Sequence, residues 1–379
     1  MQRRSFNSAL VAGLSAPALI GLSSAARAAG KPATIRIGFP GAGTGGRPLP
    51  TSGFTANAVF RGEIEQEFAA DGIKIEWKYY VGAGPALNEA YANGLLDFCF
   101  GHGDLPLIVG RSTGLKHKIL LSSGRGGDSY FIVPASSSAK SIADVKGKTL
   151  SVQKGTAGQL TLYRVLAKNG FNDPEKEFRI ISQITDDRRA SLATGDIAGA
   201  VDTPFGLEAR GVAKRIWEIF DDPEISAPGS VWVGEAFDNQ YPELVQRIVN
   251  RLVKVAHWST QEANRETQYQ LWTRSGSNAY IDNKQSWDRI KDLRTRINPL
   301  IDDYYIAAIN KSIAETKKYR LTRRDVSLDG WLKLDYLNNA LREQKLENYW
   351  PKQDASGKSP RPSCELKSQY GHFFTHHGK

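Results

Sequence analysis

Apolar positions along this chain change repeatedly between two spacings. Short β-prone runs alternate with stretches in which apolar residues recur at every third or fourth position. In the first such stretch, Phe60, Ile64 and Phe68 share one face, and Gly72 ends a predicted helix over 57–72. The predicted strands are 34–39, 73–81, 95–101, 116–123, 129–135, 148–155, 178–184, 198–205, 215–220 and 230–234, and the helices between them are 84–94, 104–114, 156–170, 186–197 and 206–213.

The last third of the chain has the helical spacing alone. Residues 241–258 place Leu244, Ile248 and Leu252 on one face, and further helices are predicted over 262–275, 285–295, 299–318 and 328–345. Strands joined by crossover helices define an α/β fold. The two α/β sets meet near 125–135 and again near 226–235, so we predict two lobes with a hinge and a cleft between them. The predicted division is lobe 1 from 31–128 plus 232–349, lobe 2 from 129–231, and a C-terminal tail of 350–379.

Composition is that of a soluble globular protein. The chain has 379 residues, of which 40% are hydrophobic and 24% charged, and its formal net charge is +10. A positive net charge can indicate a nucleic-acid-binding protein, but the basic residues of this chain are scattered and do not cluster. A mild excess of positive charge favours small anionic ligands by electrostatic steering.

The first 28 residues are typical of an export signal. Arg3 and Arg4 precede a weakly apolar stretch over 9–25, and an A-x-A cleavage site ends at Ala28. The Arg-Arg-Ser-Phe sequence fits the twin-arginine form, with an ordinary secretory signal as the alternative. Cleavage leaves 47 basic against 40 acidic residues, a net charge of +7. We therefore expect a periplasmic protein, for which nucleic acid is not a partner.

The two cysteines do not suggest a disulfide. Cys99 lies in the apolar run LLDFCFG, and Cys364 lies in the polar tail. An exported protein is free to form disulfides, but a buried strand and a terminal tail are poor partners. Cys99 is predicted to be a core residue.

Several motifs resemble the solute-binding proteins of nitrate, sulfonate and taurine importers. Residues 81–110 carry an A-G-P turn before a helix (Ala83-Gly84-Pro85) and a later glycine–aspartate pair, and residues 130–171 carry A-D-V-K-G-K followed by K-G-T. The segment ATGDIAGAVDTPF matches a further motif but lacks the aromatic residue that follows Asp202 in the family, where Thr203 stands. The resemblance covers residues 34–235 well, whereas the C-terminal segment resembles the family only in being helical.

The resemblance implies a type II periplasmic-binding-protein fold of two lobes. It also implies an extracytoplasmic protein that closes on a small organic anion, sulfonate or carboxylate, and delivers it to an ABC permease. No cofactor and no metal are expected, and we expect a monomer. Relatives on the same scaffold include desulfinase-like enzymes with a nucleophilic cysteine near the end of the first strand. The segment GFPGAGTGGRPLP has no cysteine there, which favours a binding protein over the enzyme.

The glycine-rich segment 38–50 is the first candidate for a ligand site. Its G-x-G-x-x-G spacing matches a dinucleotide fingerprint, which requires a helix directly after the glycines. Pro48 and Pro50 prevent that helix. A loop at the carboxyl end of the first strand, with Thr44 and Arg47 reaching the cleft, fits better, and a solvated surface arm is the alternative.

Two further turns precede predicted helices. Gly82, Gly84 and Pro85 form a helix start whose free N–H groups are suited to an anion, with a plain strand–helix turn as the alternative. His102 follows a strand and is placed to donate to a ligand. Asp104 is suited either to the ligand site or to capping its helix.

The stretch SVQKGTAGQL is the third helix start. Gly155 permits close backbone approach, Thr156 offers a hydroxyl, and Ala157 begins the helix with open N–H groups. The residue order K-G-T and the absence of glycine at Leu150 exclude a phosphate-binding P-loop.

The remaining candidates lie near strand ends and the hinge. Asp202, Phe205 and Trp232 are assigned to the cleft and Asp186 is a further candidate, although aromatic residues at such places more often pack in the core. A buried sulfonate also needs a cationic partner, since it cannot be neutralised by protonation. Arg47, Arg125 and Arg188 are all candidates, and the sequence leaves the choice open.

Overall fold

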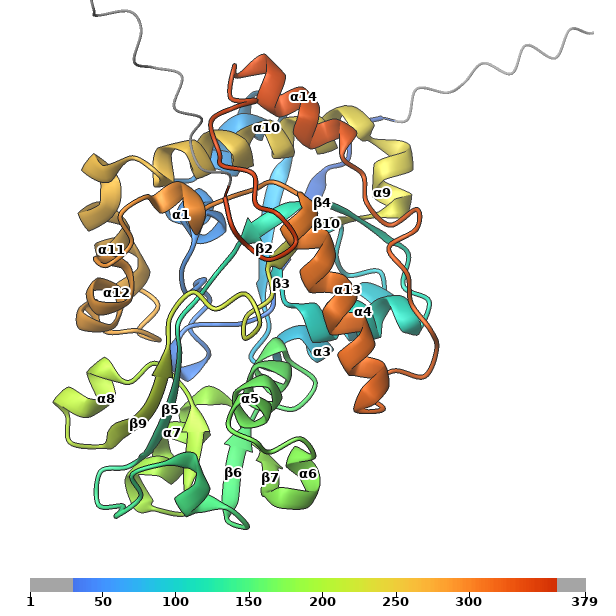
Figure 1. The fold of residues 1–379 in the computed structure, drawn as a ribbon. Helices are drawn as coiled ribbons and strands as arrows, with labels where there is room; N and C mark the ends of the chain where they lie inside the picture. The colour runs from blue at the N-terminus through green and yellow to red at the C-terminus, as the bar shows by residue number, and fades with distance from the viewer. Residues whose placement is uncertain (1–29, 360–379) are drawn as a thin grey trace, which may run out of the picture. The chain divides into compact units, whose positions relative to one another are not determined.

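The strands of this protein are arranged in two separate five-stranded sheets. A computed structural model describes residues 30–359, and the predicted signal segment and the end of the tail lie outside them. One sheet has the strand order β2-β1-β3-β10-β4 and the other β7-β6-β8-β5-β9 (Figure 1). We call the first sheet with its helices lobe 1 and the second sheet with its helices lobe 2.

Lobe 1 contains both ends of the described chain. Its helices cover the two faces of the first sheet (Figure 1). The strands are β1 (Thr34–Phe39), β2 (Lys74–Tyr79), β3 (Phe98–His102), β4 (His117–Gly124) and β10 (Gly229–Gly234), and the α-helices are α1 (Phe54–Phe60), α2 (Glu63–Phe68), α3 (Ala83–Ala92), α4 (Asp104–Ser112), α9 (Glu235–Gln240), α10 (Pro242–Ser259), α11 (Arg265–Thr273), α12 (Tyr280–Trp287), α13 (Asp303–Lys318) and α14 (Asp335–Glu343).

Lobe 2 is the smaller part and is built from one continuous segment. Its parallel strands β6, β7 and β8 are joined by helices, as the alternating pattern predicts. The strands are β5 (Ser129–Pro134), β6 (Thr149–Val152), β7 (Arg179–Ser182), β8 (Gly199–Val201) and β9 (Ala213–Ile219), and the α-helices are α5 (Ala157–Lys168), α6 (Pro174–Glu177), α7 (Thr185–Thr194) and α8 (Phe205–Ala209).

The chain passes between the lobes twice, after β4 and after β9. The strand that follows each passage, β5 or β10, enters its new sheet antiparallel to both neighbours. Gly124, Gly126 and Gly127 of the first passage all have positive φ, a conformation that glycine adopts without strain. The predicted boundary between residues 231 and 232 falls inside β10, which belongs to the lobe 1 sheet along its whole length.

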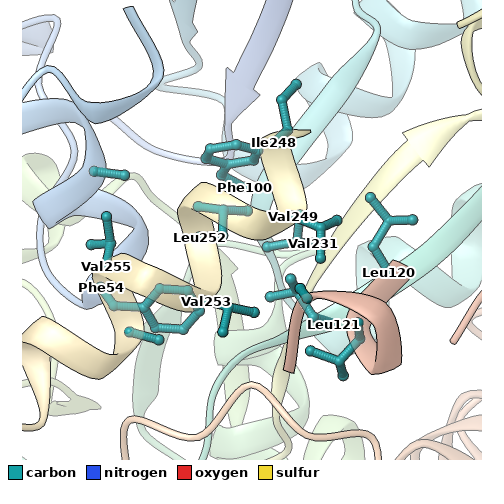
Figure 2. Packing of buried hydrophobic residues seen from close by; sticks show 14 of the residues in the cluster. Phe54, Phe100, Leu120, Leu121, Val231, Ile248, Val249, Leu252, Val253 and Val255 are labelled. Carbon is teal, nitrogen blue, oxygen red and sulfur yellow. The ribbon is translucent and has the colours of Figure 1, made fainter. Parts of the chain in front are cut away.

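The main core of lobe 1 lies between its sheet and α10. Figure 2 shows Ile248, Val249 and Leu252 of α10 packed near Phe100 and Val231 of the sheet. The predicted apolar face of 241–258 is fully buried, which confirms the helical spacing. Burying side chains of this size stabilises the lobe by about 1.5–3 kcal/mol each.

Several predicted helices are shorter than the apolar spacing suggested. Gly62 adopts a left-handed conformation, with φ of 63°, and divides the predicted helix 57–72 into α1 and α2. The prediction 285–295 is wrong over most of its length, since α12 ends at Trp287. The prediction 328–345 is wrong over its first part, since α14 spans Asp335–Glu343. Apolar residues between these helices pack from irregular segments, which helical spacing cannot distinguish. Within residues 30–359, no helix is both long and apolar enough to cross a membrane.

Candidate functional site

A cavity of about 570 Å³ lies between the two lobes. Lobe 1 contributes the loop over residues 40–46 after β1 and the start of α3, and lobe 2 contributes Gln153 and the start of α7. These segments follow the carboxyl ends of parallel strands, which is where α/β folds bind ligands. We call this space the cleft cavity.

Two arginines and one aspartate form the charged wall of the cleft cavity. Asp202 accepts hydrogen bonds from Arg189 at Nε (3.1 Å) and Nη2 (2.9 Å), and from Arg188 Nη2 (3.0 Å). Burial would raise the pKa of Asp202, but the charges of Arg188 and Arg189 outweigh it and lower that pKa below its ordinary value. Asp202 is therefore ionised, and it holds both guanidinium groups at the cavity.

Arg188 retains unused hydrogen-bonding capacity. The residue is 8% exposed, and its Nε has no hydrogen-bond partner among the described residues. Within the described part of the chain, its Nη2 donates to Asp202 and, at 3.4 Å, to the hydroxyl of Thr185. A buried donor without a partner costs about 1–3 kcal/mol, so the described residues leave Arg188 incompletely satisfied at the cavity wall.

The first turn of α7 lies at the same wall. Ile184, Thr185 and Asp186 line the cavity, and a helix leaves its first N–H groups without intrahelical partners. Asp186 accepts a hydrogen bond from the backbone N–H of Gly45 at 2.9 Å, which links lobe 2 to the loop of lobe 1. The cavity thus combines donors for an anion with a contact between the lobes.

The structure discriminates between the three candidate arginines. Arg125 donates to Asp302 at 2.7 Å with a fully buried side chain, and Arg47 donates to the backbone oxygen of Arg274 at 2.7 Å. Neither lines the cleft cavity, whereas Arg188 does.

Of the thirteen site residues assigned from sequence, two line the cleft cavity. Thr44 lies on the lobe 1 side, where its hydroxyl donates to the backbone oxygen of Gly276 at 2.9 Å, and Asp202 lies on the lobe 2 side. Both belong to loops that follow strands, as the sequence pattern predicts.

The two predicted helix starts, at residues 82–85 and 155–157, pack against each other and do not face an open cavity. A Cβ added at Gly155 would lie 2.9 Å from Pro85, and one added at Gly103 would lie 2.6 Å from Ala157. The hydroxyl of Thr156 donates to the backbone oxygen of Gln153, three residues earlier, at 2.7 Å. This region is a close contact between the lobes, and its residues do not line the cavity.

Gly82 and Gly84 lie close to other residues of lobe 1. Gly82 precedes α3, and a Cβ at Gly84 would lie 2.3 Å from Pro106 and 3.2 Å from His102 Nε2. Ala83, between the two glycines, is the residue of this turn that lines the cavity.

His102 and Trp232 lie in the core of lobe 1. Both are completely buried, and Trp232 Nε1 donates to His102 Nδ1 at 2.9 Å. Burial lowers the pKa of His102 to about 3, so the ring is neutral. The neighbouring Cys99 is also fully buried, which confirms its prediction as a core residue, and burial raises its thiol pKa.

Asp104 and Phe205 have structural contacts away from the cavity. Asp104 accepts hydrogen bonds from Arg164 Nη2 and from Ser312 Oγ, each at 2.8 Å, and so joins α5 of lobe 2 to α4 and α13 of lobe 1. Arg164 also pairs with Glu315 at 2.6 Å. Phe205 packs edge-on against Tyr130 inside lobe 2.

Some cavity residues gave no signal in the sequence. Gln153 follows β6, Arg189 follows Arg188, and Ser277 and Asn278 come from the segment between α11 and α12. Arg189 Nη1 donates to the backbone oxygen of Ser277 at 2.7 Å. That contact joins positions 88 residues apart, which no local pattern could reveal.

The two sheets, the double passage between them and the cleft define a type II periplasmic-binding-protein fold. The chain belongs to the NMT1/THI5-like family, whose model matches residues 68–260. No curated protein matches this chain.

Solved structures of the same fold agree with this assignment. A protein named as the periplasmic sulfonate-binding protein SsuA of a sulfonate ABC transporter from Methylobacillus flagellatus KT is 30% identical, with a TM-score of 0.69, over 85% of this chain and 97% of that one. The alkanesulfonate-binding protein SsuA from Xanthomonas axonopodis pv. citri, bound to MOPS, is 20% identical with a TM-score of 0.67, over 81% of this chain and 100% of that one.

The same fold also occurs in an enzyme. The desulfurization enzyme DSZB is 16% identical with a TM-score of 0.61, over 82% of this chain and 99% of that one. At that identity only the fold is shared. The resemblance as a whole supports a binding-protein role, and the choice between binding and catalysis depends on the residues of the site.

Proposed function

We propose that this protein is the substrate-binding component of an ABC importer for a small organic anion of the sulfonate or carboxylate type. The observation that carries the proposal is Arg188, which lines the cleft cavity with a buried, unpartnered Nε. The first-turn N–H groups of α7 lie at the same wall and favour negative charge. The sulfonate-binding name of the 30% identical relative supports the ligand class.

The mechanism follows from the position of the cavity. The anion contacts α7 in lobe 2 and the 40–46 loop in lobe 1, so it favours the arrangement in which both lobes approach it. The glycine-rich passage at Gly124, Gly126 and Gly127 supplies the backbone freedom for that motion. The bound protein then presents its ligand to the permease as a monomer in the periplasm, after cleavage near Ala28.

Cys99 does not suit the alternative, a desulfinase-like enzyme. A nucleophilic cysteine needs an accessible thiolate, whereas Cys99 is fully buried and burial raises its pKa. It pairs with Trp232 across the sheet and does not line the cleft cavity. A binding role is therefore favoured by the chemistry of the described residues.

A ligand screen followed by calorimetry tests the proposal. Thermal-shift measurements compare alkanesulfonates, arylsulfonates, carboxylates and nitrate, and isothermal titration then measures the affinity of each stabilising anion. We expect organic anions to raise the melting temperature, because a ligand that binds the folded state stabilises it. Stabilisation by none of these anions, or turnover of a sulfinate probe, would contradict the proposal. Fractionation of cells that express the full chain, with N-terminal sequencing, tests export and cleavage.

A further inference from the structure

One segment of lobe 1 forms a side of the cleft cavity. It comprises residues 274–282, which run from the end of α11 into the first turn of α12. Ser277 and Asn278, in the middle of this segment, line the cavity together with the 40–46 loop and the start of α7. We call the segment the strap.

The first end of the strap is fixed within lobe 1. The backbone N–H of Thr44 donates to the backbone oxygen of Ser275 at 3.0 Å, and the hydroxyl of Thr44 donates to that of Gly276 at 2.9 Å. Just before the strap, Trp272 Nε1 donates to the side chain of Asn57 in α1 at 2.8 Å, and both side chains are completely buried. These contacts do not involve lobe 2, so this end of the strap belongs to lobe 1 in any arrangement of the lobes.

The second end of the strap contacts lobe 2. Asp282 is 6% exposed, and its Oδ1 accepts a hydrogen bond from the backbone N–H of Gly206 in α8 at 2.8 Å. Its Oδ2 accepts from the N–H of Ala279, within the strap, also at 2.8 Å. Burial would lower the pKa of Arg189 in lobe 2, but the charges of Asp202 and Asp282 contribute to raising that pKa above its ordinary value. The charge of the strap at Asp282 is therefore complementary to lobe 2.

The contact with Asp282 requires that Gly206 has no side chain. Gly206 lies in a helix and its φ is not positive, so alanine would suit its backbone conformation and is the better helix former. A Cβ added at Gly206 would, however, lie 2.7 Å from Asp282 Oδ2 and 3.3 Å from the Cβ of Ala279. An approach of 2.7 Å forces the two segments apart, so the close packing of the strap accounts for a glycine at this position.

We infer that the docking of Asp282 on Gly206 holds the strap against lobe 2, so that Ser277 and Asn278 close the cavity over a bound anion only when the lobes are together. Asp282 and Gly206 are positioning residues, since neither of them lines the cleft cavity. The inference rests on the proposed function and adds to it the contact that retains the anion. Because the strap engages after the anion has entered, its effect falls on the rate of release.

Gly206→Ala tests the contact, with Gly158→Ala as the matched control. Each glycine is the second residue of a helix of lobe 2, but a Cβ at Gly158 would meet only Thr156 and Val152 of the same lobe, at 3.4 and 3.6 Å. Stopped-flow tryptophan fluorescence measures the association and dissociation rates of the tightest anion found for the wild type. We expect Gly206→Ala to raise the dissociation rate roughly tenfold, as the loss of one hydrogen bond to a charged group gives. Its association rate should be that of the wild type, and Gly158→Ala should leave both rates unchanged.

A second variant changes the other side of the contact without adding an atom. Asp282→Asn keeps the shape of the side chain and removes its charge, so it should also raise the dissociation rate, by less than Gly206→Ala. The effects of the two changes should not add in the double variant, because both act on one contact. Urea unfolding shows whether the fold is affected, and the midpoint of Gly206→Ala should match that of Gly158→Ala. If Gly206→Ala does not fold, the dissociation rate of Asp282→Asn decides.

The outcomes for this inference and for the proposed function are distinct. If the wild type binds an anion and both strap variants release it at the wild-type rate, only the inference fails. Fully additive effects in the double variant would also overturn it, since they would assign the two residues to separate contacts. If the wild type binds no anion, the proposed function fails, and the role of the strap in binding fails with it.

Discussion

Replacing Arg188 by alanine should weaken anion binding far more than it weakens the fold. Arg188 donates one hydrogen bond to Asp202, at 3.0 Å, and it lines the cleft cavity with a guanidinium whose Nε has no partner among the described residues. A hydrogen bond to a charged group contributes about 1.5–3 kcal/mol. Since about 1.4 kcal/mol corresponds to a tenfold change, Arg188→Ala should raise the dissociation constant of an organic anion by roughly ten- to a hundredfold.

The neighbouring Arg189 provides a matched control. In Arg188→Ala, Asp202 keeps two hydrogen bonds from Arg189, so the loss of stability should be about 1 kcal/mol. In Arg189→Ala, Asp202 keeps only one arginine contact, and the loss should approach the roughly 3–5 kcal/mol measured when a buried pair is broken. Arg188→Ala should therefore show the larger loss of affinity, and Arg189→Ala the larger loss of stability.

Titration calorimetry and urea unfolding measure the two effects separately. Both variants are titrated with the tightest anion found for the wild type, and the free energy of unfolding is taken from the denaturation midpoint and slope. The reasoning is refuted if Arg188→Ala binds the anion as tightly as the wild type. It is also refuted if Arg189→Ala loses more affinity than Arg188→Ala while keeping its stability.

Three further predictions concern the buried polar groups. Burial lowers the pKa of His102 and of His117 to about 3. Between pH 3 and about pH 6.5 the unfolded chain therefore binds more protons than the folded protein. The contribution of the two neutral histidines to the free energy of unfolding is complete above about pH 6.5 and is lost as the pH falls towards 3. Urea unfolding should show a loss of about 1.4 kcal/mol per histidine at one pH unit below 6.5, and His117→Asn should have a smaller pH dependence; an unchanged dependence would contradict the assignment. Arg164→Met should destabilise the protein by about 3–5 kcal/mol in urea unfolding, because it leaves the buried carboxylate of Asp104 without its arginine between the lobes. An unaltered midpoint would argue against that contact. In a Cys364→Ser variant, Cys99 should resist a thiol reagent until denaturant is added, and rapid labelling in native buffer would support the enzyme alternative.

Local sequence patterns predicted the strands and helices of the two lobes well, because the spacing of apolar residues follows from which face of each element is buried. The apolar face of 241–258 and the alternating strands and helices correspond to buried faces in the structure. The patterns failed where a single backbone conformation intervened, as at Gly62, or where apolar residues pack from irregular segments before Asp335. Strand order and the antiparallel entry of β5 and β10 depend on pairing between distant segments, and no local pattern encodes it.

The candidate site divides in the same way. The sequence by itself predicted a ligand site on loops that follow strands, because residue type and strand ends are local properties. Thr44 and Asp202 of that prediction line the cleft cavity, and Arg188 was one of three arginines that the sequence left open. Only the tertiary structure decided that Arg188 faces the cleft cavity while Arg125 is committed to Asp302. It also decided that the helix start at Gly155 packs against the opposite lobe. The physical reason is that the neighbours of a side chain decide whether its charge and hydrogen-bonding groups are already paired or remain for a ligand. Those neighbours come from distant parts of the chain.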